Sequence, residues 1–102
     1  RRFPWELEEK VNDDDFASDF SSRYYIRLGV SDEEGTLSKI AGVFGRAGIS
    51  LATVVQKEAA TKEVPVIFIT HETKESIVRK ALAKIEQLSG VERIAALIRV
   101  EE

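Results

Sequence analysis

Residues 22–57 place an alternating segment, a short polar turn and an amphipathic helix in direct succession, and this order constrains the fold more than any other feature of the chain. The alternation predicts a half-buried strand, whose apolar face is made of Tyr24, Ile26, Leu28 and Val30. Residues 31–35 are too polar and too few for anything but a turn. Helical spacing then predicts a buried stripe, made of Leu37, Ile40, Ala41 and Phe44. Gly48 is suited to end this helix in a left-handed conformation.

The second half of the chain predicts further elements of the same kinds. Residues 49–58 have a strand pattern that breaks at Val54 and Val55, where we expect a bulge. Residues 64–70 are apolar on both faces, which predicts a covered central strand with Pro65 near its beginning. Thr73 is the expected N-cap of a second helix that ends at Gly90. The stripe of that helix consists of Ile77, Val78, Ala81, Leu82, Ile85 and Leu88.

The last strand completes a βαββαβ order. Its alternation places one set of side chains on one face, namely Ile94, Ala96, Ile98 and Val100, and a second set on the other, namely Ala95, Leu97 and Arg99. The order predicts an α+β, ferredoxin-like sandwich, in which a four-stranded antiparallel sheet carries two helices on one face. The opposite face, with Ile67, Ile69 and Leu97, is too apolar for water and needs a cover from a second copy, the leader or another domain.

Composition limits the classes of function. The chain has 102 residues, 43% of them hydrophobic, which is enough for one core. A net charge of −3 gives no electrostatic drive toward nucleic acid or anionic membranes. Without cysteine there is no disulfide, thiolate metal site or thiol nucleophile, and the single His71 cannot build a zinc site. No apolar run has membrane-spanning length, and we expect a cytoplasmic location.

Residues 1–21 differ from the rest of the chain. They are acidic, contain Pro4 and a run from Asp13 to Asp15, and show no sustained period. We interpret residues 1–21 as a linker or leader from an absent upstream domain. The sequence contains no methionine, even at position 1, which favours a fragment of a larger protein.

The turn before the first helix is the candidate ligand site. The first N–H groups of a helix have no internal acceptor and carry partial positive charge, so a ligand carboxylate is a suitable partner. Gly35 lets the backbone approach a ligand closely, and Asp32 offers a carboxylate to an ammonium group. Such a loop would recognise a free amino acid. The alternative is that Asp32 and Thr36 only cap the turn and the helix.

These residues carry a family resemblance. Residues 32–37, with Ile40-Ala41, Phe44-Gly45 and residues 48–51, resemble the signature of the ACT domain, a ligand-binding regulatory module. Residues 22–28, 55–57, 69–71 and 95–100 are similar to the C-terminal ACT domain of homoserine dehydrogenase. We therefore interpret residues 22–102 as an ACT regulatory domain. Glu34 stands where such loops usually have proline, and it adds a negative charge beside the proposed carboxylate site.

The resemblance implies a function. ACT domains commonly pair as homodimers and bind effectors between copies, near the loop into the first helix and the following strand of a neighbour. By resemblance the effector site is formed by Asp32, Gly35, Thr36 and Leu37 of one chain and by Ile49, Ser50, Leu51 and Ala52 of the same or the paired chain. The usual effector is threonine. The parent enzyme would interconvert homoserine and aspartate semialdehyde with NAD(P), whereas this fragment contains no dinucleotide-binding glycine motif and should not catalyse.

Three other functions were weighed. The chain could be the ACT module of another enzyme of amino-acid metabolism. A small ferredoxin-like enzyme such as an acylphosphatase is disfavoured because the acidic residues 32–34 would repel phosphate. A ferredoxin-like RNA-binding domain could stack bases on Tyr24, Tyr25 and Phe68, but the charge balance supplies no basic groove.

Overall fold

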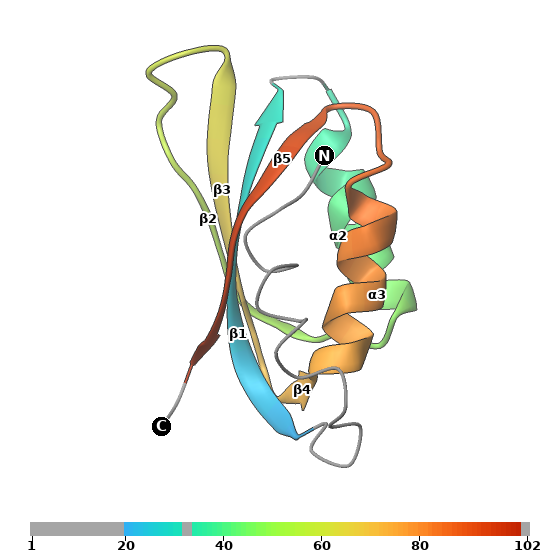
Figure 1. Cartoon of the computed structure of the whole chain (residues 1–102). Helices are drawn as coiled ribbons and strands as arrows, with labels where there is room; N and C mark the ends of the chain where they lie inside the picture. Colours follow the sequence, from blue (N-terminus) through green and yellow to red (C-terminus); the bar gives the residue numbers. More distant parts are fainter. Residues whose placement is uncertain (1–19, 32–33, 101–102) are drawn as a thin grey trace.

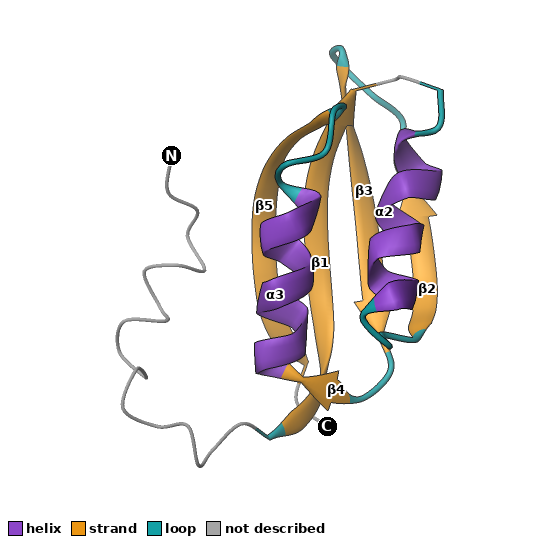
Figure 2. Ribbon diagram, turned by 90° about the vertical axis from the view of Figure 1, so that its right-hand side faces the viewer, coloured by secondary structure: helices purple, strands orange, loops and turns teal. Residues whose placement is uncertain are grey.

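The computed structural model describes residues 20–31 and 34–100. Along the chain, it contains β1 (Ser21–Ser31), α2 (Thr36–Arg46), β2 (Leu51–Gln56), β3 (Glu63–Thr70), β4 (Thr73–Lys74), α3 (Glu75–Ile85) and β5 (Val91–Val100). The long strands form an antiparallel sheet in which β3 and β5 flank β1, and β2 pairs with the outer edge of β3. Both helices cover one face of this sheet (Figures 1 and 2). The predicted ferredoxin-like sandwich is confirmed.

The core lies between the sheet and the helices. The predicted inward face of β1, consisting of Tyr24, Ile26, Leu28 and Val30, is buried throughout. From β3, Phe68 packs against Phe44 of α2, with their ring centroids 5.2 Å apart. In α2 the buried stripe is shifted from the predicted one, because Val43 is buried while Ala41 is exposed. Complete burial of Tyr24 and Phe68 also removes two of the three aromatic side chains that base stacking on RNA would need.

The faces predicted for the last strand are wrong. Leu97 pairs with Ile26 and packs against the core, so it lies on the helix side of the sheet. The register of β5 shifts by one residue at Ala95. An extra residue breaks the alternation of period two, so Ile94 and Leu97 face the helices while Ile98 faces away. The sequence does not indicate this bulge, because apolar residues continue on both sides of it.

Two other local predictions are corrected. Thr73 does not cap α3, because it pairs with Ser22 in the short strand β4 and the N-cap position falls on Lys74. In β2 the irregularity lies between Leu51 and Thr53, which is earlier in the strand than predicted. Both errors arise where strand pairing uses a residue that local propensity assigns to another role.

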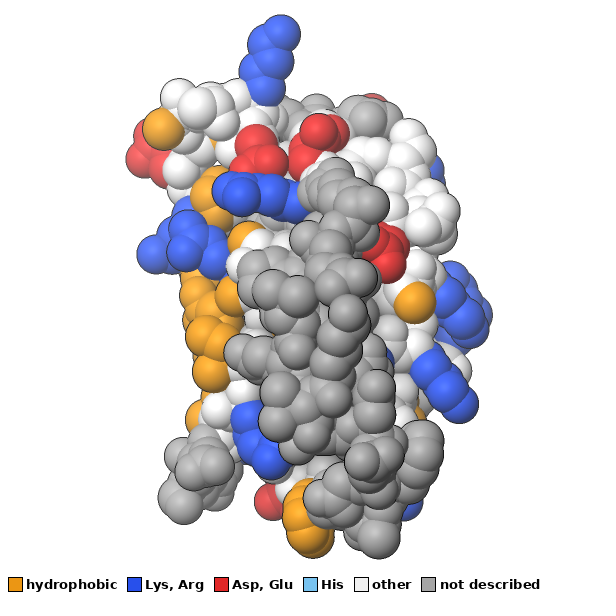
Figure 3. All heavy atoms as spheres, viewed as in Figure 1, with side chains coloured by type: hydrophobic (Ala, Val, Ile, Leu, Met, Phe, Trp, Pro, Cys, Tyr) orange, Lys and Arg blue, Asp and Glu red, His pale blue; other side chains and the backbone are white. Residues whose placement is uncertain are grey.

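The sheet face away from the helices is apolar and open. Figure 3 shows hydrophobic side chains gathered on that side of the molecule. Its apolar residues include Val55, Ile67, Ile69 and Ile98, and 54% of the surface of Ile98 is exposed. The face therefore resembles the predicted uncovered surface, except that Leu97 does not belong to it.

Candidate effector site

The start of α2 has backbone N–H donors that no carbonyl group of the helix itself accepts. Gly35 is the N-cap residue, with a φ of 87°, and as a glycine it supplies no side-chain cap to the helix. Because this φ is left-handed, a side chain at position 35 would strain the backbone. The first helical hydrogen bond runs from the Lys39 N–H to the Gly35 carbonyl oxygen. The N–H groups of Thr36, Leu37 and Ser38 therefore have no acceptor within the helix.

The side chain of Thr36 points into the protein, so only its backbone is available to a ligand at the start of α2. Its side chain is 3% exposed and faces the turn that precedes β5. A Cβ atom at Gly90 would lie 2.4 Å from the Thr36 hydroxyl oxygen. The Thr36 hydroxyl therefore packs inside the protein, and the alternative in which this side chain caps the helix is not what the structure contains.

The second half of the predicted site lies at the other end of α2. Residues 49–52 follow the end of this helix, whereas Gly35 precedes its start. An 11-residue helix is about 16 Å long, so one chain does not bring the two halves together. Ile49 belongs to the core, while Ser50 and Ala52 are exposed and Leu51 is half-buried.

Two contacts near the predicted site residues involve residues that the predicted effector site did not include. The His71 N–H donates to the Ser50 carbonyl oxygen at 2.8 Å, so the end of β3 lies beside the start of β2. Gly90 contacts Thr36, although the sequence assigned it only the end of a helix. Asp32, the predicted partner of the ammonium group, lies outside the described residues and stays a prediction.

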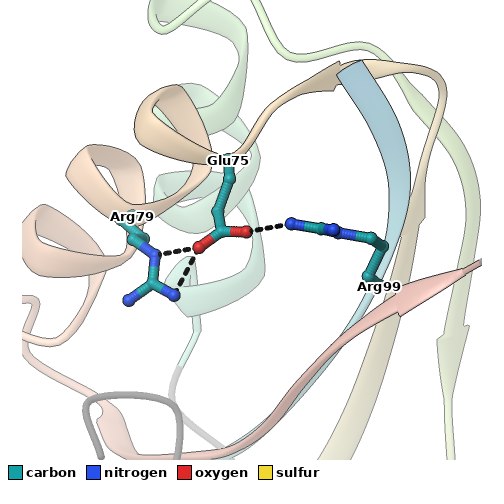
Figure 4. A network of polar contacts seen from close by, with 3 residues as sticks. All are labelled: Glu75, Arg79 and Arg99. Carbon is teal, nitrogen blue, oxygen red and sulfur yellow. Dashed lines mark hydrogen bonds and ion pairs between the residues drawn. The ribbon is translucent and has the colours of Figure 1, made fainter. Parts of the chain in front are cut away.

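At the start of α3, a carboxylate of the protein itself lies in the first helical turn. Glu75, in the first helical turn, accepts hydrogen bonds from Arg99 of β5 at 2.6 Å and from Nε of Arg79 at 2.7 Å (Figure 4). Burial raises the pKa of Glu75, but the hydrogen bonds from Arg99 and Arg79 outweigh this effect and hold the pKa below its usual value. The carboxylate also meets the positive end of the helix dipole.

A hollow of about 380 Å³ lies at the far end of β1 from the Gly35 loop. Its lining includes Arg23 and Arg99, but none of the predicted effector residues. Arg99 is paired with Glu75, and Arg23 donates to the Thr70 carbonyl oxygen. Residues 20–31 and 34–100 contain neither a cluster of three metal-ligating side chains nor a helix long and apolar enough to cross a membrane.

Comparison with known proteins identifies the family. The ACT domain family matches residues 24–90, which include the Gly35 loop, both helices and the strands β2 and β3. The chain belongs to the ACT domain family. The solved ACT domain from the GTP pyrophosphokinase of Chlorobium tepidum has the same fold, with a TM-score of 0.60 at 18% identity, and covers 78% of this chain and 99% of that one.

Homoserine dehydrogenases are more similar to this chain in sequence than that ACT domain is. The enzyme of Pseudomonas aeruginosa is 36% identical over 83 residues, which are 79% of this chain and 19% of that protein. The crystal structure of a homoserine dehydrogenase from Thiobacillus denitrificans is 34% identical, with a TM-score of 0.74, over 82% of this chain and 18% of that one. This ACT domain thus spans about a fifth of the length of the relatives it matches.

Proposed function

We propose that this ACT domain binds a free amino acid at the start of α2 and so regulates a homoserine dehydrogenase. The supporting observation is that α2 begins at a left-handed glycine, which supplies no side-chain cap, and has no acidic residue in its first turn. A ligand carboxylate would accept from the N–H groups of residues 35–37, and Asp32 would receive the ammonium group. The ligand would then supply the anion that the helix lacks.

The site is completed by a second copy of the domain. Because one chain separates the Gly35 loop from residues 49–52, the latter would come from the paired chain. Strand β2 is suited to pairing because it lies at a sheet edge, carries no charged residue and exposes Val54 and Val55. In this arrangement Ser50 of the paired copy would meet a hydroxyl group on the ligand, which makes threonine the proposed effector.

The parent protein would use NAD(P) to interconvert homoserine and aspartate semialdehyde, on the cytoplasmic route to threonine and methionine. The similarity to homoserine dehydrogenases supports this reaction for the parent, and the domain itself would bind only the effector. Threonine would favour one pairing of the ACT domains and thereby bias the catalytic part, which is feedback by a difference in affinity between two states.

A thermal-shift panel of the twenty amino acids tests the effector site. Threonine at a hundred times its dissociation constant would add about 2.7 kcal/mol of stability, which raises the melting temperature of so small a domain on the order of 10 °C. Gly35→Val should abolish this response. The matched control is Gly48→Val, because Gly48 also has a left-handed φ, of 79°, and lies beyond the other end of α2.

The outcomes separate binding from folding. Both valine variants should lower the melting temperature of the free domain through backbone strain, and only Gly48→Val should keep the response to threonine. An unchanged melting temperature of the wild-type domain with every amino acid would overturn the proposal.

Sedimentation of a Val54→Lys/Val55→Lys variant tests pairing of the domains, since charge on the β2 edge should give monomers.

A further inference from the structure

The turn between α3 and β5 lies against the end of β1 and the start of α2. These are the two segments on either side of the effector loop, residues 32–35. The Ser31 N–H, at the end of β1, donates to the Gly90 carbonyl oxygen at 2.7 Å. Gly90 itself has a φ of 95°, and a Cβ atom on it would lie 2.4 Å from the hydroxyl oxygen of Thr36 and 3.2 Å from that of Ser31. Gly90 therefore touches both sides of the proposed loop, where β1 ends and where α2 begins.

We propose that Gly90 is a positioning residue that places the first turn of α2 and couples effector binding there to strand β5. This inference rests on the proposed function, because it concerns the regulation of the same site. Only a glycine satisfies both demands at this position, since a side chain would strain the backbone and collide with Thr36. The N–H groups of the first turn of α2 are thus placed by a residue more than fifty positions later in the chain.

The contact also gives the site a path to the rest of the fold. Gly90 directly precedes β5, and Val91 pairs with Val30 in β1. The Thr36 side chain is buried against Gly90, so a ligand that draws the first turn of α2 outward changes the packing of the turn before β5. If the effector favours one arrangement of that turn over another by some factor, linkage requires that this arrangement bind the effector more tightly by the same factor.

Two alanine variants isolate the contact. Gly90→Ala and Gly48→Ala introduce the same methyl group at left-handed positions, but a Cβ atom at Gly48 meets nothing within 4 Å. Both should lower the melting temperature of the free domain. Only Gly90→Ala should weaken threonine binding, by about tenfold, and shift the amide resonances of Ser31 and Leu37. Adding Thr36→Ala, which removes the colliding atoms, should restore part of the affinity.

Hydrogen exchange of the wild-type domain gives a second test that needs no variant. Threonine should slow exchange at the Ser31 amide, which donates to Gly90, and at the Val91 amide, which donates to Leu88. Protection of Leu37 without protection of Ser31 and Val91 would overturn the coupling while leaving the effector site intact. Equal threonine affinity in Gly90→Ala and Gly48→Ala would overturn it too.

Failure of the proposed function has a different signature. If no amino acid binds the wild-type domain, the effector site is refuted, and the positioning role is then judged without ligand. In that case Gly90→Ala should still shift the resonances of Ser31 and Leu37, whereas Gly48→Ala should not. Unchanged resonances in Gly90→Ala would refute the positioning role as well.

Discussion

The two helices have equal lengths but begin in opposite ways. α3 starts with Glu75 in its first turn, and that carboxylate is held by Arg79 and Arg99. α2 starts at Gly35 and has no acidic residue in its first turn. Both starts carry the same partial positive charge. At α3 the protein's own Glu75 meets this charge, whereas the first turn of α2 has no acidic residue, and the proposed function assigns that role to an anionic ligand.

Under the proposed function, α3 has a structural helix start and α2 has a ligand-binding one. Glu75 ties α3 to β5, because Arg99 lies near the end of that strand. At α2 the side chains that surround the first turn are arranged to place the backbone, with Thr36 turned inward onto Gly90. Exchanging the features of the two starts is therefore the direct way to test the comparison.

The largest effect is expected from Glu75→Gln. This change removes the negative charge from a half-buried site and leaves two guanidinium groups facing an amide, which should cost about 1–2 kcal/mol of unfolding free energy. Urea unfolding measures this loss. Glu72→Gln, at an exposed residue just before β4, is the control with little expected change. A threonine response lost in Glu75→Gln would contradict the separation of the two helix starts.

A carboxylate placed at the start of α2 should have the next largest effect. Ser38→Glu gives α2 an acidic residue in its first turn at an exposed position. It should stabilise the free domain by about 0.3–1 kcal/mol and lower threonine affinity severalfold, because the protein then supplies its own anion. Calorimetric titration checks the affinity. Ser38→Gln should bind threonine like wild type, and equal binding by the glutamate variant would count against the site.

A smaller effect is expected from Glu34→Pro. Proline at this exposed position removes a negative charge beside the site and stiffens the turn before Gly35, so threonine affinity should rise by less than the severalfold loss expected for Ser38→Glu. Glu34→Ala removes the charge alone, so the difference between the two variants measures the contribution of the ring. Weaker threonine binding in both variants would mean that Glu34 takes part in recognition.

The smallest effect concerns pH. The pKa of Glu75 is lowered in the folded protein, so its stabilising contribution is present above the ordinary glutamate pKa of about 4.3 and is lost as pH falls through the lower folded value. The stability difference between wild type and Glu75→Gln should thus be constant near neutral pH and shrink on acidification. A difference that grows in acid would contradict the assignment. Unfolding curves from pH 7 to pH 3 measure it.

Much of the fold could be predicted because the hydrophobic periodicity and the turn-forming residues indicate the same elements. The inward face of β1 and the left-handed glycine after α2 were predicted correctly. The predicted end of the second helix at Gly90 is wrong, because α3 ends at Ile85 and a non-helical turn follows it. The errors at Thr73 and Ala95 occur where pairing with β1 overrides local pattern. These positions depend on strands far away in sequence, which single-residue preferences do not encode.

The candidate site was only partly predictable for a related reason. The Gly35 loop is a local motif and could be recognised within a few residues, whereas the contact between Thr36 and Gly90 joins positions 54 residues apart. The separation of the loop from Ser50 depends on the length of α2 and was visible only in three dimensions. The sequence therefore indicated the backbone N–H groups at the start of α2, but it did not indicate the contact with Gly90.

A titration of the ¹⁵N-labelled domain with threonine, followed by amide resonances, tests the central claim most directly. The account predicts saturable shifts that are largest for Gly35, Thr36 and Leu37 at the start of α2, with Ser76 and Ile77 at the start of α3 nearly unchanged. Shifts of equal size at both helix starts, or saturable shifts that avoid the start of α2, would contradict it.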